Sequence, residues 1–239
     1  MSMVGQSWSL VIFCYNEAGT IARVITDALA AGQHLAQQQP YEVLVVDDGS
    51  QDGSGPIMDA LAQQNSLIRI VRHPKNRGIG PALISGYQSA QYENICAIPA
   101  DGQFEIKELY PFATFGSNEV IAFYRPEKTG YELYRQVLTW LNSFLNKLLL
   151  GLQMKDVNWV KVYKREQVQS LPLSLKSSLL ESEICAKLKH QKRDFKEYPS
   201  EYLRRESGEP KGGSLKTLAA AAKEFLKLVY SVNKYRLKN

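Results

Sequence analysis

The run VLVVDDGSQDGS at residues 43–54 constrains the fold of this chain more than any other feature. Its four apolar residues show no polar alternation, which is typical of a strand in a parallel sheet covered on both faces. Asp47 and Asp48 follow at the end of that strand, where both are expected to be open to solvent, and glycines and serines then turn the chain. Ligands of open α/β sheets bind beyond the carboxyl ends of the strands. The run therefore predicts a polar ligand site at one sheet edge, although the same residue types also suit an ordinary capped turn.

Three further apolar runs, at residues 9–15, 67–71 and 94–98, alternate with helical patterns over the first hundred residues. This alternation predicts repeated βα units and a mostly parallel sheet with helices on both faces. No G-x-G-x-x-G follows the first strand and no G-x-x-x-x-G-K-[ST] occurs, which disfavours a dinucleotide-dependent dehydrogenase and a P-loop enzyme. Three strand ends with acidic residues should therefore meet at one edge of the sheet.

Composition places the chain among globular proteins, with 44% apolar and 22% charged residues and a net charge of +5. The three cysteines lack metal-ligand spacing and are expected to be core residues in a reducing compartment. No secretory signal and no apolar run long enough to span a bilayer is present, so we expect a cytoplasmic protein or one lying on the inner face of a membrane. Seven basic residues and one acidic residue follow Pro210, which favours either an anionic surface or a solvated helix.

The segments C-Y-N-E-A (residues 14–18) and V-V-D-D-G-S-Q-D-G-S (residues 45–54) resemble the nucleotide-sugar half of family 2 glycosyltransferases. The similarity is greatest to the branch of polyprenyl-phosphate sugar transferases, such as dolichol-phosphate mannose synthase. It implies a GT-A, Rossmann-like α/β fold. It divides the chain into a glycosyltransferase domain at 1–210, with a donor half at 1–104 and an acceptor half at 105–210. A basic C-terminal helix and tail follow at 211–239, with the amphipathic helix expected over roughly 215–232.

The resemblance also implies which residues bind the nucleotide sugar. The first strand end borders the base, the second carries the two carboxylates, and P-K-N-R-G-I-G-P-A (residues 74–82) lies beside the donor diphosphate, at a helix start that suits phosphate. The donor-binding residues so predicted are Tyr15, Asn16, Glu17, Asp47, Asp48, Arg77, Gly78 and Asp101.

The family commonly has D-x-D-x-Q after its fourth strand, where this chain reads P-A-D-G-Q. The resemblance therefore assigns Asp101 and Gln103 to a Mg²⁺ or Mn²⁺ ion, which prefers oxygen ligands and keeps diphosphate oxygens as others. Pro99 replaces the first Asp of the motif, a substitution that weakens the metal assignment or alters the ribose contacts.

The second half is the acceptor half by the same resemblance. A strand at 120–123 precedes Arg125, a helix at 131–150 carries Arg135, and L-L-L-G-L-Q-M-K-D-V-N-W-V-K (residues 148–161) is similar to a family segment that singles out Asp156 and Lys161. Y-L-R-R-E-S-G (residues 202–208) resembles H-x-P-R-x-x-G, with Arg205 matching. The predicted acceptor-binding residues are Arg125, Arg135, Lys161 and Arg205, and the predicted catalytic residues are Asp101, Arg125, Arg135 and Asp156. In the alternative, purely structural interpretation, Asp156 caps a helix or forms an ion pair, and Lys161 projects from an edge strand.

Three hypotheses follow from these patterns. The first is an inverting, metal-dependent transfer of a sugar from a nucleotide sugar to a polyprenyl phosphate, whose anionic oxygen needs no general base. The second is transfer to a saccharide hydroxyl, which needs a base such as Glu181, Glu183 or Asp156. The third is a non-catalytic nucleotide-sugar binder, suggested by Pro99. Nucleic acid is not an expected partner, and the sequence does not define the oligomeric state.

Overall fold

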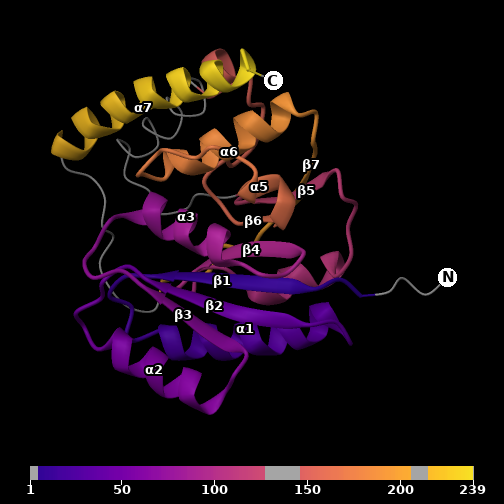
Figure 1. Ribbon diagram of the computed structural model, residues 1–239, viewed down its shortest axis with the longest axis vertical. Helices are drawn as coiled ribbons and strands as arrows, with labels where there is room; N and C mark the ends of the chain where they lie inside the picture. Colours follow the sequence, from indigo (N-terminus) through magenta and orange to yellow (C-terminus); the bar gives the residue numbers. More distant parts are fainter. Residues whose placement is uncertain (1–4, 127–145, 206–214, 239) are drawn as a thin grey trace.

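The computed structural model describes residues 5–126, 146–205 and 215–238, with only the backbone described at 215–222. Strands and helices alternate over the first hundred residues, as predicted (Figure 1). The strands are β1 (Trp8–Cys14), β2 (Tyr41–Asp47), β3 (Ile68–Arg72), β4 (Asn94–Pro99), β5 (Glu119–Tyr124), β6 (Lys161–Lys164) and β7 (Asp194–Pro199). The helices are α1 (Ile21–Ala36), α2 (Ser54–Gln64), α3 (Ile79–Ser89), the 3₁₀ helix η1 (Ile106–Phe112), α5 (Arg165–Gln169), α6 (Leu179–His190) and α7 (Leu215–Arg236).

The described strands form one seven-stranded sheet in the order β3-β2-β1-β4-β6-β5-β7. β1 pairs in parallel with β2 and β4, and β2 pairs in parallel with β3. β6 is antiparallel to both of its neighbours, whereas β5 and β7 are parallel to each other. The carboxyl ends of β1, β2 and β4 therefore lie side by side at one edge of the sheet, as the strand-end residues predict.

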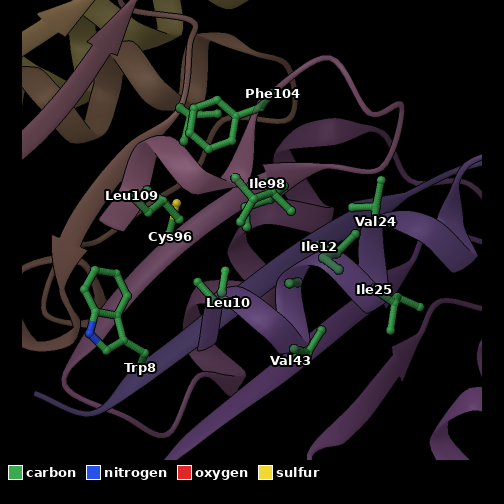
Figure 2. Packing of buried hydrophobic residues seen from close by; sticks show 14 of the residues in the cluster. Trp8, Leu10, Ile12, Val24, Ile25, Val43, Cys96, Ile98, Phe104 and Leu109 are labelled. Atoms are coloured by element: carbon green, nitrogen blue, oxygen red, sulfur yellow. The ribbon is translucent and has the colours of Figure 1, made fainter. Parts of the chain in front are cut away.

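Helices cover both faces of the sheet, and each face has its own apolar core. α1, α2 and η1 pack on one face, over side chains that include Trp8, Leu10 and Ile98 (Figure 2). α3, α5, α6 and α7 lie on the opposite side, with α7 outermost in Figure 1. Gly86 allows α3 to approach β1 closely, because a Cβ there would lie 2.4 Å from Cγ1 of Val11. This contact confirms the close packing predicted from the small residues of α3.

Two predictions need correction. The structural alternative for Lys161 predicts an edge strand. Lys161 instead begins β6, which lies between β4 and β5 in the interior of the sheet. The last helix was expected to end near Val232 and instead continues to Arg236. The predicted helix at 131–150, with Arg135, falls mainly outside the described residues, which resume at Asn146.

In the part of the chain that the structure describes, none of the helices has the length and apolar character required to cross a bilayer. The described end of α7 packs on the domain instead. Leu228 and Val232 are fully buried in the core shared with α6. Lys187 of α6 donates to the hydroxyl of Ser231 (3.0 Å), and Gln191, just after α6, donates to the hydroxyl of Tyr235 (2.7 Å), which links α7 to α6 as well.

Candidate active site

A cleft of about 730 Å³ opens at the carboxyl ends of β1, β2 and β4. It extends from the segment after β1 to the loop before α3 and to the turn after β4. The residues that line it are Phe13, Cys14, Tyr15, Glu17, Asp48, Asn76, Gly78, Ile79, Ala82, Pro99, Ala100, Asp101 and Arg205. We call it the donor cleft. It brings together residues from each of the segments that the sequence assigned to the nucleotide sugar.

Hydrogen bonds join the first two strand ends. Asn16 has a left-handed backbone (φ 55°), which asparagine tolerates better than most residues. Its amide N–H donates to Oγ of Ser50 (3.0 Å), and its side-chain oxygen accepts from the N–H of Gln51 (2.8 Å). The N–H of Glu17 donates to Oγ of Ser54 (3.0 Å). The serines of the D-D-G-S-Q-D-G-S run thus position the Y-N-E segment along the donor cleft.

Asp47 and Asp48 are not at a solvent-open strand end, as was expected, because both are almost completely buried. Asp47 accepts from the N–H of Ser50 (2.8 Å) and from Nε of Arg72 (3.0 Å). Its carboxylate is therefore engaged in holding the turn and β3. The exposure prediction was wrong because it treated the strand end alone and could not include the neighbouring β3.

Asp48 organises the loop between β3 and α3. Its carboxylate contacts Nδ1 of His73 (2.6 Å) and accepts from the backbone N–H groups of Arg77 (2.9 Å) and Gly78 (2.8 Å). Gly78 has a positive φ of 93°, a conformation that glycine adopts without strain. The Arg77 side chain is exposed beside this loop, whereas Asn76 and Gly78 line the donor cleft. Asp48 thus shapes the wall of the cleft.

Asp101 lines the donor cleft from the turn after β4, and its Oδ1 accepts from the N–H of Gln103 (3.2 Å). Burial raises the pKa of Asp101 above its ordinary value, an effect that Arg205 and Arg125 partly offset. The side chain of Gln103 faces the segment after β7, where its amide nitrogen donates to the hydroxyl of Tyr202 (2.6 Å). Asp101 is thus placed for a ligand in the cleft, and Gln103 connects its loop to Tyr202.

Within residues 5–126, 146–205 and 215–238, no group of three or more His, Cys, Asp or Glu side chains has the arrangement of a metal site. Asp101 nevertheless fits one part of such a site, because it is a cleft-lining carboxylate whose desolvation a divalent cation would offset.

A smaller pocket of about 210 Å³ continues from the donor cleft towards α3 and α6. The two cavities share Phe13, Ile79, Pro99 and Asp101 as walls. The smaller pocket is further lined by Leu83, Tyr87, Ala97, Asn158, Trp159, Val160, Lys161, Ser178 and Glu181. We call it the inner pocket. Pro99 therefore lies at the junction of the two cavities, a position that its deviation from the family motif did not reveal.

Lys161 forms part of a buried polar network beneath the inner pocket. Its Nζ donates to the carbonyl oxygens of Val157 (2.6 Å) and Trp159 (2.9 Å) and to Oε2 of Glu181 (3.1 Å). Burial alone would lower the pKa of Lys161, but the Glu181 carboxylate raises it above the ordinary value. All three N–H groups are directed at protein acceptors, which favours a structural role for Lys161 over the predicted acceptor contact.

Glu181 and Glu183 are also engaged within the protein. Glu181 accepts from the hydroxyls of Tyr87 (2.8 Å) and Tyr163 (2.7 Å) in addition to Lys161. Glu183 is completely buried, and it accepts from Nζ of Lys187 (2.7 Å) and from the N–H of Ser174 (3.1 Å). The sequence offers both glutamates as bases. The partners of Glu181 come from α3 and β6, whereas Lys187 lies one helical turn after Glu183 in α6, a spacing that already indicates an ion pair.

Arg125 follows the end of β5. Its Nε donates to Oδ2 of Asp156 (2.8 Å), and its guanidinium lies 4.4 Å from the ring centre of Trp159 and 5.4 Å from that of Tyr202. Its proximity to Asp101 helps to lower the pKa of that carboxyl. The structure thus brings together three of the predicted catalytic residues, Asp101, Arg125 and Asp156.

Arg205 reaches the donor cleft from the segment after β7, where its guanidinium forms an ion pair with Glu17. Tyr202, in the same segment, bonds to Gln103 and forms an isolated antiparallel bridge with Phe104. The segment 202–205 therefore closes one side of the cleft. Tyr202 departs from the family's H-x-P-R-x-x-G pattern and is assigned no role by it, and its packing against the turn after β4 depends on contacts between distant segments.

This strand order, with one antiparallel strand inside an otherwise parallel arrangement and a cleft at the carboxyl ends of β1, β2 and β4, is the architecture of GT-A glycosyltransferases. The model of the family "Glycosyl transferase family 2" matches residues 9–168. The chain belongs to this family.

Individual relatives extend the comparison. An undecaprenyl-phosphate 4-deoxy-4-formamido-L-arabinose transferase from Aeromonas hydrophila is 28% identical over 168 residues, covering 68% of this chain and 50% of the relative. An undecaprenyl-phosphate mannosyltransferase from Micrococcus luteus is 24% identical over 213 residues, covering 84% of this chain and 85% of the relative. The crystal structure of glucosyl-3-phosphoglycerate synthase from Mycobacterium tuberculosis with UDP has a TM-score of 0.66 at 20% identity, covering 95% of this chain and 80% of the other.

The similarity to that crystal structure concerns the fold. This chain spans between 31% and 50% of the length of three of the curated relatives it matches, and 85% of the Micrococcus luteus enzyme. Family membership supplies the class of reaction, and the particular substrates are inferred from the site.

Proposed function

We propose that this protein transfers a sugar, with inversion, from a nucleotide sugar to a polyprenyl phosphate. One observation carries the choice of acceptor. Each carboxylate that the sequence offered as a general base in the acceptor half is engaged by the protein: Asp156 by Arg125, Glu181 by Lys161 and two tyrosines, and Glu183 by Lys187 and backbone N–H groups.

A phosphate acceptor suits such a site. A hydroxyl acceptor gives up a proton as it attacks the anomeric carbon, and efficient transfer requires a group to take it. A phosphate monoester is already anionic at neutral pH, so it requires placement and charge neutralisation instead. The names of the relatives from Aeromonas hydrophila and Micrococcus luteus, both transferases to undecaprenyl phosphate, agree with this inference.

The donor occupies the cleft at the strand ends in this proposal. Tyr15, Asn16 and Glu17 border the base, Asp48 holds the loop that approaches the diphosphate, and Arg77 lies exposed beside that loop. Asp101 holds Mg²⁺ or Mn²⁺, with Gln103 as a second ligand. When bound, the cation supplies neutralisation of the charge that grows on the departing nucleoside diphosphate. Arg205, at the edge of the cleft, adds a further positive charge near the leaving group.

Arg125 is the described residue best placed to receive the acceptor phosphate. Its guanidinium is planar and permanently charged, and it lies close enough to Asp101 to affect that carboxyl's pKa. Trp159 and Asp156 fix its orientation. Arg135 belongs to the same proposal on sequence grounds, because it lies outside the described residues.

The test is a comparison of matched acceptors. Purified protein is supplied with Mn²⁺ and a panel of UDP and GDP sugars, then with a short polyprenyl phosphate in detergent, the corresponding polyprenol, or a free saccharide. We expect transfer to the phosphate and none to the alcohol. Arg125→Lys should lower transfer about tenfold or more while nucleotide affinity stays constant, because lysine loses the paired donors. Arg193→Lys, at the opposite edge of the sheet, is the matched control.

Two results would contradict the proposal. Efficient transfer to a saccharide that survives Arg125→Lys would support a hydroxyl acceptor. Binding of a nucleotide sugar without turnover on any acceptor would support a non-catalytic binder.

A further inference from the structure

α7 has two different faces in its described part. The inner face is docked on the domain, with Leu228 and Val232 fully buried and the side chain of Glu224 accepting from the N–H of Lys176 (2.6 Å). The outer face consists of exposed residues spaced by three or four positions. They are Lys223, Leu226, Lys227, Tyr230, Asn233 and Lys234, together with Leu237 in the turn that follows the helix. We call these residues the α7 stripe.

The apolar members of the α7 stripe are among the most exposed large side chains described. Leu226 is 72% exposed, Tyr230 69% and Leu237 89%. Leu148 and Leu149, at 65% and 41%, are exposed just before the buried Leu150, whose carbonyl accepts from Arg236 of α7 (2.6 Å). Exposed leucines thus occur on two segments joined by a hydrogen bond, on the side of the molecule where α7 is outermost (Figure 1).

The charge of this surface has one sign. Lys223, Lys227 and Lys234 separate the apolar residues of the stripe, and Lys147 precedes the exposed leucines. The sequence has a single acidic residue after Pro210, Glu224, and its carboxylate is bound to the backbone of Lys176. The stripe therefore presents leucine, tyrosine and lysine to solvent without an acidic residue of its own.

We propose that the α7 stripe, with Leu148 and Leu149, docks this protein on the surface of an anionic lipid bilayer. Amphipathic helices lie in a bilayer interface with leucine and aromatic side chains inserted among the headgroups. Lysine stems extend over apolar surface while the ammonium groups reach lipid phosphates. The docking inference rests on the proposed function only for the reason why the protein binds a bilayer, because a polyprenyl phosphate acceptor is held in one.

The composition of the stripe favours a bilayer over a second copy of the chain. The centres of protein–protein interfaces are depleted in lysine, whereas three lysines alternate with the apolar residues here. Two copies related by a twofold axis would bring these lysines against one another. An anionic bilayer accommodates the same pattern without repulsion.

The test measures co-sedimentation of the full chain with vesicles that contain no acceptor lipid. Phosphatidylcholine vesicles with phosphatidylglycerol should bind the protein, vesicles of phosphatidylcholine alone should bind it weakly, and salt should reduce binding. Lys223→Glu with Lys227→Glu should lower binding to anionic vesicles by more than about tenfold. Leu226→Ser with Tyr230→Ser should lower it on both vesicle types. Lys107→Glu, on the exposed surface of η1 on the other side of the sheet, is the matched control and should change nothing.

Folding of each variant is checked by thermal unfolding, and transfer to a detergent-dispersed polyprenyl phosphate is measured separately. The docking inference predicts that both double variants keep that transfer while losing vesicle binding. Wild-type protein that ignores anionic vesicles at low salt, or variants that bind like wild type, would overturn it. A dimer abolished by the leucine and tyrosine changes, without vesicle binding, would assign the stripe to a second copy instead. Failure of transfer with intact vesicle binding would count against the proposed function alone.

Discussion

Three aspartates that look alike in the sequence have different surroundings in the fold. Asp47 and Asp48 are buried, and each accepts hydrogen bonds from neighbouring loops. Asp101 lines the donor cleft and has a pKa raised by burial. Their common position after apolar strands was readable from the sequence. Asp48 also lines the cleft, but its carboxylate, like that of Asp47, is held by neighbouring loops, and this difference from Asp101 depends on which loops turn their N–H groups inward.

Removing the Asp48 carboxylate should destabilise the protein as well as weaken nucleotide binding. Asp48→Ala leaves His73 and the N–H groups of Arg77 and Gly78 without their acceptor, at a cost of about 3 kcal/mol or more. Asp59→Ala is the matched control, because its ion pair with Arg72 is exposed and worth under about 1 kcal/mol. Urea unfolding measures both. A stability of Asp48→Ala equal to that of the control would contradict the structural role.

Asp101→Asn should separate stability from activity. Turnover with Mn²⁺ should fall at least about a hundredfold, because the charge facing the leaving group is lost. The stability of the Asp101→Asn protein should instead rise relative to that of wild type. Since the folded pKa lies above the unfolded value, wild-type protein loses stability as pH rises from about 4 through the folded pKa.

The asparagine variant lacks this loss, so its advantage in melting temperature should grow over that window and then level off. The comparison is made by thermal unfolding without divalent metal. A variant that melts below wild type at neutral pH would show that the Asp101 charge stabilises the fold.

At the scale of elements, the described βα units of the first half follow from local patterns, and β6 does not. Four residues beginning with a lysine give little strand signal, and nothing local indicates antiparallel insertion between β4 and β5. Burial of Lys161 is possible because Glu181, on α6, and the carbonyls of residues 157 and 159 meet its ammonium group. Such a network joins segments far apart in the sequence. The sequence alone therefore predicts an acceptor contact for Lys161 and does not indicate that its ammonium group is held by Glu181.

Lys161 and Glu181 should therefore behave as a structural pair. Lys161→Met leaves a buried carboxylate without its cation and should cost about 3–5 kcal/mol of unfolding free energy. Adding Glu181→Gln should recover much of that loss, since the remaining amide can still accept from a tyrosine. Chemical unfolding of the two single variants and the double variant gives the coupling. A stable Lys161→Met protein with a raised KM for the acceptor alone would restore the acceptor role.

At the scale of the molecule, the sequence predicts the α/β class, the alternation of elements and the edge of the sheet that carries the site. These follow from apolar runs, turn residues and helical spacing, all of which act locally. The inner pocket and the closing segment at 202–205 arise from contacts between segments far apart in the sequence, and the carboxylates of the acceptor half are occupied mainly by partners within that half. Because these carboxylates are engaged, a phosphate is favoured over a hydroxyl as the acceptor.

The central claim is that the anomeric carbon passes from the nucleotide to a phosphate oxygen in one inverting step. A donor labelled with ¹³C at the anomeric carbon, incubated with Mn²⁺ and a short polyprenyl phosphate, allows the new bond to be read by NMR. We predict coupling between the labelled carbon and one lipid phosphorus, with the anomeric configuration opposite to that of the donor. A product whose labelled carbon lacks phosphorus coupling, or one with retained configuration, would contradict the account.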